Sequence, residues 1–267
     1  MQFSGPQRIA RAQTFDQIAE LYDRGRREPP AWIYSTLFEK TRLNPASARI
    51  LEAGCGTGKS TLPLARRGAH VVALEMGANL ARLAKLNLAL YPRVEVLQSR
   101  FEDFSLDERF DLVLAVTSWH WLDPAQRYKC ALNALKPGGW LAFTTGGHAF
   151  PPGYDPFFRD IQRAYEAVGA ATIPWPPPPP DAFADSREEI EQSGLFTDIQ
   201  VFRHLWHEEF SADEYITLME TASDHRLMEP DKRDRLFAAM RILISARPNN
   251  RIVKHNNTVL HIARKPL

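Results

Sequence analysis

The chain has 267 residues, 44% of them hydrophobic, and its 33 basic and 32 acidic side chains leave a formal net charge of +1. This length allows one large core with a small cap, and the balanced charge gives no support to a nucleic-acid partner. Two cysteines are too few for a disulfide framework, and no residue cluster suggests a metal site. The opening MQFSGPQRIA lacks the apolar stretch of a signal peptide, and no segment reaches the roughly 20 apolar residues that span a bilayer. We therefore expect a cytoplasmic protein with no membrane partner.

The first half of the chain has the pattern of a parallel sheet. Two short helical patterns, at residues 15–22 and 31–41, predict a flap over the edge of this sheet. Short β-branched runs then alternate with helical patterns, which is typical of βαβ units. The expected strands are 49–53, 70–75, 94–98, 110–116 and 140–145, and the expected helices are 58–67, 78–88 and 124–135, the last ending in a Lys-Pro-Gly-Gly stop signal.

After residue 147 the pattern changes. Residues 173–180 read IPWPPPPP, which predicts an extended polyproline II spacer to which the sequence assigns no role. The expected helices here are 157–168, 211–221 and 231–246, and the expected strands are 197–206 and 251–264. We predict an α/β fold, a doubly wound, mostly parallel, seven-stranded Rossmann-like sheet with a helical cap. Its parts are a flap (1–48), a cofactor-binding core (49–147) and a region with the cap insertions and the last two strands (148–267).

The first expected strand runs directly into a glycine-rich turn. The turn reads Glu52-Ala53-Gly54-Cys55-Gly56-Thr57-Gly58, and a helical pattern follows it. Small residues let a ligand approach the backbone, and the start of a helix offers unpaired N–H groups. Three classes of ligand suit such a turn: a nucleotide phosphate, a nicotinamide dinucleotide and S-adenosylmethionine.

Acidic residues around the turn favour the third class. The turn nearly matches the phosphate loop G-x-x-x-x-G-K-[ST], but Ala53 replaces the first glycine and Glu52 would repel phosphate. The dinucleotide fingerprint G-x-G-x-x-G is also not met, because the third glycine comes one residue early, at Gly58. Glu75 ends the second expected strand, where a carboxylate can accept both hydroxyls of an unphosphorylated ribose. S-adenosylmethionine, which carries an amino group and such a ribose, suits both acids.

The chain resembles the class I S-adenosylmethionine-dependent methyltransferases of the small-molecule branch (methyltransferase type 11-like) in four segments. These are ILEAGCGTGKST, VVALEMG, FDLVLAVTSWHWLDP and LKPGGWLAF, in the order and spacing of that family. The resemblance implies that Glu52 and the turn backbone hold the methionine end, that Glu75 takes the ribose and that Met76 packs on adenine. Arg100 stands where many relatives have an aspartate, so Phe101 and Glu102 are the expected adenine contacts. The other candidate cofactor contacts are Tyr22 in the flap, Gly54, Cys55, Gly56, Thr57, Gly58 and Thr117.

The candidate catalytic residue follows the fourth expected strand. The sulfonium of the cofactor makes its methyl group electrophilic, so the enzyme mainly places a nucleophile in line, at about 3 to 3.5 Å, and excludes water. His120 lies at the sheet edge where ligands bind and is the candidate general base. Trp119 and Trp121 flank it and are candidate substrate contacts, with packing of the cap as the alternative. His225, in the region of the late helices, is a further candidate substrate contact.

The sequence therefore predicts direct in-line transfer of a methyl group from S-adenosylmethionine to an oxygen, nitrogen or carbon of a small-molecule acceptor. The main alternative is a protein that binds this cofactor without methyl transfer, and a P-loop nucleotide hydrolase is less favoured. The acceptor, the methylated atom, the need for a base and the oligomeric state are not specified by the sequence.

Overall fold

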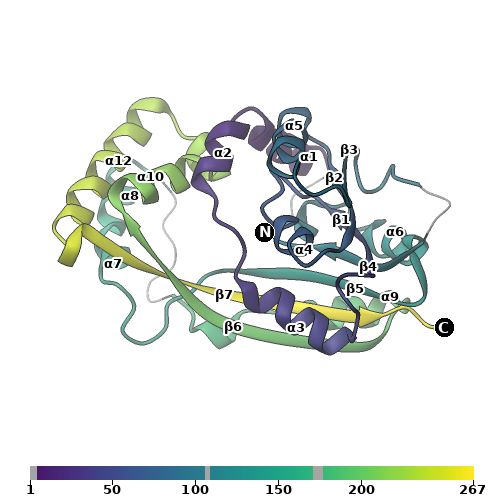
Figure 1. Cartoon of the computed structure of the whole chain (residues 1–267). Helices are drawn as coiled ribbons and strands as arrows, with labels where there is room; N and C mark the ends of the chain where they lie inside the picture. Colours follow the sequence, from purple (N-terminus) through teal and green to yellow (C-terminus); the bar gives the residue numbers. More distant parts are fainter. Residues whose placement is uncertain (1–4, 106–108, 171–176) are drawn as a thin grey trace.

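The computed structural model describes residues 5–105, 109–170 and 177–267. Within them, seven strands form one sheet in the order β3-β2-β1-β4-β5-β7-β6 (Figure 1). The neighbours from β3 to β5 are parallel, whereas β7 runs antiparallel between β5 and β6. The bounds are β1 (Arg49–Ala53), β2 (His70–Glu75), β3 (Val94–Gln98), β4 (Phe110–Ala115), β5 (Leu135–His148), β6 (Thr197–Ser211) and β7 (Arg251–Arg264). This arrangement confirms the predicted mostly parallel, Rossmann-like sheet.

The strand order reverses beside β1. From β1 the chain passes outward to β2 and β3, then returns to place β4 on the other side of β1. The first strands are apolar at consecutive positions and buried on both faces, as the central strands of such a sheet are. A reversal of strand order leaves a crevice at the carboxyl ends of the strands, and the glycine turn begins there.

Helices cover both faces of the sheet. One face packs against α3 (Ala31–Thr41), α4 (Leu62–Ala65) and α5 (Ala78–Asn87), around a core that includes Leu37, Ile50 and Leu64. The other face packs against the 3-10 helix η1 (Trp119–Trp121), α6 (Arg127–Ala134) and α9 (Arg187–Ser193), around Phe143 and Ile190. The sheet is therefore doubly wound, as predicted.

A helical cap lies at one end of the long strands β6 and β7, away from the parallel part of the sheet (Figure 1). It has its own apolar cluster, which includes Phe157, Phe210 and Met240. The cap helices are α7 (Phe157–Asp160), α8 (Gln162–Ala167), α10 (Ala212–Glu220), α11 (Ser223–Arg226) and α12 (Pro230–Ser245). The N-terminal helices α1 (Gly5–Asp16) and α2 (Ala19–Gly25) contact both α5 and this cap. In the described part of the chain, no helix is both long and apolar enough to cross a membrane.

Several elements differ from those predicted. The helix expected at 58–67 is only the short α4, because Gly58 has a φ of 89° and the preceding residues form turns. The helix expected at 157–168 is divided into α7 and α8. The Lys-Pro-Gly-Gly segment lies within the start of β5, where the pairing with β4 is irregular. Helices α9 and α11 were not predicted, η2 (Pro180–Ala182) and η3 (Pro248–Asn250) are single 3-10 turns, and residues 173–176 of the polyproline segment lie outside the described residues.

A buried histidine joins β7 to the start of α9. The ring of His261 is fully buried and stacks on Phe143 at a centroid distance of 4.6 Å. Its Nε2 accepts a hydrogen bond of 2.9 Å from the backbone N–H of Ser186. An accepting nitrogen is incompatible with a proton, and burial lowers the pKa of His261 to about 4. The folded protein therefore keeps this histidine neutral.

We expect His261 to make the protein sensitive to acid. In the unfolded chain, His261 binds a proton below its ordinary pKa of about 6.5, whereas in the folded chain it binds one only near pH 4. The free energy of unfolding therefore falls as the pH drops from about 6.5 to about 4. The shift corresponds to about 3 kcal/mol for this fully buried group. Chemical denaturation at several pH values should show a smaller loss for His261→Gln, whose amide oxygen can accept from Ser186. The exposed His70→Gln is the control; an unchanged pH profile in His261→Gln would contradict the assignment.

Candidate functional site

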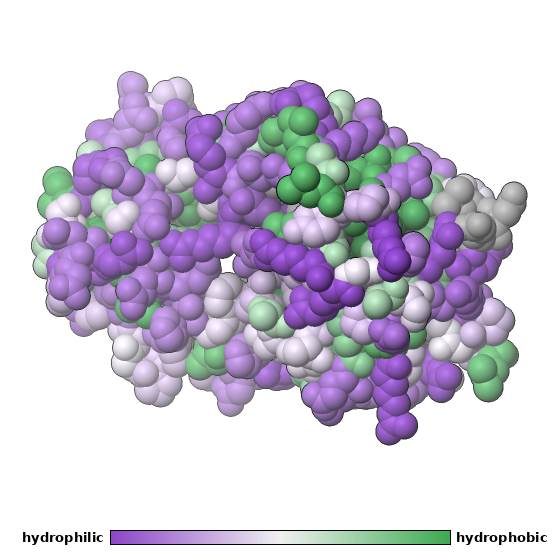
Figure 2. Space-filling view, in the orientation of Figure 1, coloured by the Kyte–Doolittle hydropathy of each residue, from purple (hydrophilic) through white to green (hydrophobic). Residues whose placement is uncertain are grey.

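One large cavity opens at the carboxyl ends of the parallel strands. Its volume is about 860 Å³, and its walls come from the flap, the glycine turn, the strand ends and the cap. The face shown in Figure 2 is mainly hydrophilic and is hollowed near its middle. A volume in this range holds a ligand the size of a nucleoside derivative together with a second small molecule.

The glycine turn forms one wall. Gly54, Gly56 and Gly58 have φ values of 75°, 58° and 89°, a region in which residues with a Cβ are strained. The N–H groups of Gly54 and Cys55 both donate to the carbonyl of Leu74, at 2.8 and 3.0 Å. The turn is thus tied to β2, with Gly54, Cys55, Gly56 and Thr57 lining the cavity.

Glu75 holds two loops together at the end of β2. Its Oε2 accepts from the N–H of Gly56 at 2.9 Å, and its Oε1 accepts from the N–H of Gly77 at 2.8 Å. Burial raises the pKa of Glu75, and these two backbone hydrogen bonds oppose the rise. The side chain lines the cavity, and its oxygens have further lone pairs, so it can accept from a ligand hydroxyl.

Glu52 lies beneath the turn and not in the cavity wall. It is fully buried, and Thr61 Oγ1 donates to its Oε2 at 2.6 Å. Burial raises the pKa of Glu52, opposed by the hydroxyls of Ser60 and Thr61. Gly58 is likewise absent from the cavity lining. It packs against Leu88 instead, since a Cβ at this position would lie 2.8 Å from Leu88 Cδ1. The structure therefore gives these two predicted contacts a supporting place behind the wall.

The expected adenine contacts all line the cavity. Met76, Phe101 and Glu102 are among its lining residues, as is Arg100. Glu102 accepts from the backbone N–H of Asp123 at 2.6 Å, and one Arg100 guanidinium nitrogen lies 3.5 Å from its Oε2. The arginine that replaces the expected acid is therefore paired with the next acid along the chain.

Thr117 is a strained residue at the end of β4. It has a φ of 55° although it is β-branched, a conformation that costs on the order of 1–2 kcal/mol. Its backbone N–H donates to Thr144 Oγ1 at 2.9 Å, which holds the strained conformation in place. Thr117 lines the cavity, as does Thr144.

The flap closes the cavity from the other side. A Cβ placed on Gly56 would lie 3.7 Å from Tyr22 Cε1, so the Tyr22 ring faces the glycine turn. The ring of Phe15 contacts both Tyr22 and Trp121 edge-on, each at 5.5 Å between centroids. Next to it, Asp16 Oδ1 accepts from the first backbone N–H groups of α5, those of Asn79 at 2.8 Å and Leu80 at 3.0 Å. The flap is therefore attached both to η1, through Phe15 and Trp121, and to the start of α5, through Asp16.

His120 and Trp121 reach the cavity, but Trp119 does not. The His120 ring is open to the cavity, and desolvation, followed by the Arg127 charge, lowers its pKa to about 4. Trp119 is buried, stacks on Phe143 at 4.6 Å and lies below the Arg127 guanidinium at 5.2 Å. Trp119 therefore packs in the core, as the alternative had it, whereas Trp121 lines the cavity and stays a candidate substrate contact.

His225 also lies outside the lining. It is buried in the cap, where its Nε2 shares a hydrogen bond of 2.8 Å with the Tyr165 hydroxyl. Its neighbours Ser223 and Asp224 line the cavity instead. His225 thus supports the cap wall from behind.

Part of the wall was not foreseen from the sequence. Phe15, Arg26 and His148 line the cavity. So do Trp206 and Glu208 of β6 and Lys254, Asn256, Asn257 and Thr258 of β7. A signal for the last group was present, because a run of polar residues in the middle of a strand is unusual unless it faces a ligand or a polar partner.

The side chains near the turn do not form a phosphate site. The Lys59 ammonium lies 3.6 Å from a carboxylate oxygen of Asp23, and Glu75 is hydrogen-bonded to the turn itself. Burial, and then the charges of Glu52 and Glu75, raise the pKa of the Cys55 thiol. Both acids would oppose a triphosphate here. Among the described residues, no group of three or more His, Cys, Asp or Glu side chains could hold a metal ion.

Comparison with known proteins shows what the central part of the chain resembles. Residues 51–143 match the family described as "Methyltransferase domain". Within this segment the chain is similar to class I S-adenosylmethionine-dependent methyltransferases. The match covers β1 to the middle of β5 and so includes the glycine turn, Glu75 and His120.

Two curated relatives show how far the sequence likeness extends. An uncharacterised methyltransferase of Mycobacterium tuberculosis (strain H37Rv) is 33% identical over 129 residues, which are 48% of this chain and 50% of the relative. A ubiquinone biosynthesis O-methyltransferase of Xanthomonas axonopodis pv. citri is 33% identical over 112 residues, 40% of this chain and 47% of the relative. The chain therefore spans about half the length of the curated relatives it matches.

Solved structures resemble nearly the whole chain in fold. A proposed type II methyltransferase from Anaeromyxobacter dehalogenans has a TM-score of 0.61 at 19% identity, covering 91% of this chain and 99% of that one. A Haemonchus contortus phosphoethanolamine N-methyltransferase, solved with phosphomonomethylethanolamine and S-adenosylhomocysteine, has a TM-score of 0.53 at 17% identity, covering 99% and 61%. These likenesses extend the fold assignment to the cap and the last strands.

The close contact between Gly54 and Ser118 can be tested by substitution. A Cβ at Gly54 would lie 2.7 Å from Ser118 Cβ, whereas a Cβ at Gly153, which has a similar φ of 79°, meets nothing within 4 Å. Both alanine variants carry the backbone cost of about 1 kcal/mol, and only Gly54→Ala adds a clash of roughly 1–3 kcal/mol. Urea denaturation should therefore show a clearly larger loss of stability for Gly54→Ala. Equal losses would mean that Ser118 moves away without cost.

Proposed function

We propose that the protein transfers a methyl group from S-adenosylmethionine to a small-molecule acceptor by direct in-line displacement. The observation that carries this proposal is one cavity shared by two sets of residues. The glycine turn, Glu75 and Met76 line it together with His120 and Trp121, so a cofactor and an acceptor can meet without water between them. The match of residues 51–143 to a methyltransferase domain supports the same reaction.

The residues present fit the cofactor. The hydroxyl of Thr57 is buried and has no hydrogen-bond partner among the described residues, so the turn retains polar capacity for a ligand. Glu75 would accept from the ribose hydroxyls, and Met76 and Phe101 would contact adenine. When bound, the cofactor supplies an electrophilic methyl group on its sulfonium.

The protein would contribute placement, exclusion of water and proton transfer. Tyr22 and Phe15 cover the cavity from the flap, and Trp121 gives an aromatic surface beside His120. His120 has a pKa near 4 and is neutral at pH 7, so its ring can accept a hydrogen bond from an acceptor O–H or N–H. Such a low pKa makes it a weak base, so its main effect is to orient the nucleophile and take the proton as the new bond forms.

Transfer of a methyl label separates this proposal from cofactor binding alone. Protein incubated with methyl-labelled S-adenosylmethionine and the small-molecule fraction of a cell extract should produce a labelled product and S-adenosylhomocysteine in equal amounts. Cofactor binding without a labelled product, across extracts from several sources, would favour a protein that binds the cofactor for another purpose.

Glu75→Gln should weaken cofactor binding. The substitution removes a charge that would accept from two ribose hydroxyls, and charge-assisted hydrogen bonds of this kind are worth about 1.5–3 kcal/mol, or roughly 10- to 100-fold in affinity. Calorimetric titration with S-adenosylhomocysteine measures the change. Glu95→Gln, an exposed residue of β3, is the matched control and should bind like the wild type. If Glu75→Gln, shown to be folded by circular dichroism, kept full affinity, Glu75 would have no part in the cofactor site.

His120→Ala should lower turnover and leave the cofactor bound. Loss of a positioned proton acceptor typically costs about 100-fold or more in rate. Because its pKa is near 4, turnover that depends on neutral His120 should show no acid-side inflection near pH 6.5. The rate is measured with the acceptor found by label transfer, and S-adenosylhomocysteine affinity is the control. Full activity in His120→Ala would remove it from the mechanism.

A further inference from the structure

The middles of β6 and β7 supply a second, charged part of the cavity wall. Glu208 and Lys254 are directly opposite each other in the β6–β7 register, and Trp206 is opposite Asn256. All four residues line the cavity, as does Arg26, which follows α2. None of the three charged residues has a part in the cofactor site described above.

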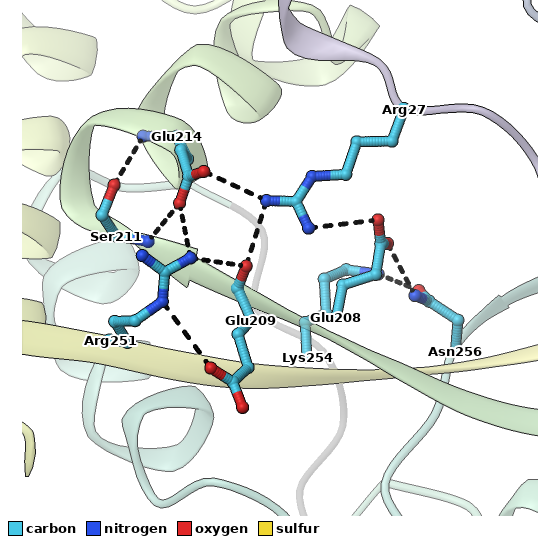
Figure 3. Close-up of polar contacts among 8 residues, drawn as sticks. All are labelled: Arg27, Glu208, Glu209, Ser211, Glu214, Arg251, Lys254 and Asn256. Atoms are coloured by element: carbon cyan, nitrogen blue, oxygen red, sulfur yellow. Dashed lines mark hydrogen bonds and ion pairs between the residues drawn. The ribbon is translucent and has the colours of Figure 1, made fainter. Parts of the chain in front are cut away.

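Glu208 is already engaged by other groups. Arg27 lies 3.7 Å from its Oε1, and the amide nitrogen of Asn256 donates to its Oε2 at 3.1 Å. Figure 3 shows its carboxylate between the Arg27 guanidinium and the Asn256 amide. The charge of Glu208 is therefore directed mainly toward Arg27, on the flap side.

Lys254 has a neutral partner. Its ammonium donates to the amide oxygen of Asn256, so this amide stands between Lys254 and Glu208 (Figure 3). Within the described residues, no ion pair joins Lys254 to a carboxylate, although Glu208 is its cross-strand neighbour. Desolvation lowers the pKa of Lys254 to about 8; the nearby Glu208 charge opposes this and the Arg26 charge adds to it.

Arg26 is in the same situation. Its Nε donates to Thr221 Oγ1 at 2.8 Å, and another guanidinium nitrogen lies 3.4 Å from the Thr221 carbonyl. In the described part of the chain it forms no ion pair with an acid. Two cations that repel each other thus line one cavity with only neutral hydrogen-bond partners, an arrangement that a bound anion would stabilise.

We propose that Arg26 and Lys254 form a subsite for the carboxylate group of the acceptor. This inference rests on the proposed function and specifies the substrate class, an organic acid. A singly charged carboxylate suits the subsite better than a dianionic phosphate, because Glu208 and Asp224 also line the cavity and would repel the second charge. Trp121, Trp206 and the His148 ring would cover the apolar part of such an acid.

Matched acid and amide pairs test the subsite. Wild-type protein is first titrated with S-adenosylhomocysteine, and the complex is then titrated calorimetrically with phenylacetate against phenylacetamide, and with hexanoate against hexanamide. Phenyl phosphate is the arm for a phosphate. The variants are Lys254→Met, which keeps the length of the side chain but not its charge, Lys254→Arg, which keeps the charge, and Arg26→Met. Lys129→Met, an exposed lysine of α6, is the control.

We expect at least one acid to bind the wild type about tenfold more tightly than its amide, as a charge-assisted pair provides. Lys254→Met and Arg26→Met should each reduce this preference, whereas Lys254→Arg and Lys129→Met should keep it. Unchanged S-adenosylhomocysteine affinity shows that the variants are folded.

Three results would overturn the inference: equal binding of acids and amides, including no binding of either at millimolar concentration; a preference that survives in Lys254→Met; or tighter binding of phenyl phosphate than of phenylacetate. If the wild type fails to bind S-adenosylhomocysteine, the proposed function is wrong. The acid and amide titrations are then run on the ligand-free protein, so the two failures are told apart.

Discussion

The candidate site depends on one carboxylate that accepts from two separate loops. Glu75, at the end of β2, holds the N–H of Gly56 in the turn after β1 and the N–H of Gly77 before α5. Because neighbouring parallel strands end at the same edge of the sheet, this single side chain sets the distance between the two loops. The glycines let the backbone come close enough for these bonds. The cavity has a defined shape on this side because its loops share an acceptor, and not because they are packed by large side chains.

The part of the cavity wall that β6 and β7 form is built differently. There the wall is the middle of two long antiparallel strands, and the helical cap is attached to their far ends (Figure 1). Asn256, Asn257 and Thr258 are buried polar groups in the middle of β7. Buried amides need hydrogen-bond partners. The amide of Asn256 finds them in the charged side chains of Glu208 and Lys254. The segment that matches the methyltransferase domain thus forms one part of the cavity wall, and β6 and β7 add a second part from outside that match.

The sequence predicted the features that depend on neighbouring residues. It did not predict the features that depend on contacts between distant parts of the chain. The strand bounds from β1 to β3 and the position of Glu75 at the end of β2 follow from patterns of a few neighbouring residues. The sequence pattern could not show that Trp119 packs on Phe143 while Trp121, two residues later, faces the cavity, because this depends on the rotation of a 3-10 turn against β5. Nor could it bring Arg26 and Lys254 together, since 227 intervening residues must first fold. The sequence pattern also could not show that Glu52 is fully buried and accepts a hydrogen bond from Thr61.

The attachment of the flap links the entry of ligands to the integrity of a helix. Asp16 caps α5, and its neighbour Phe15 contacts Trp121 at the cavity mouth, so the two ends of this contact cannot separate independently. A flap that lifts to admit or release a molecule leaves the first amides of α5 uncapped, at a cost of about 1 kcal/mol. The same helix follows Gly77, which donates to Glu75. Opening of this flap would therefore have to break the hydrogen bonds that tie Asp16 to the first amides of α5, outside the cavity itself.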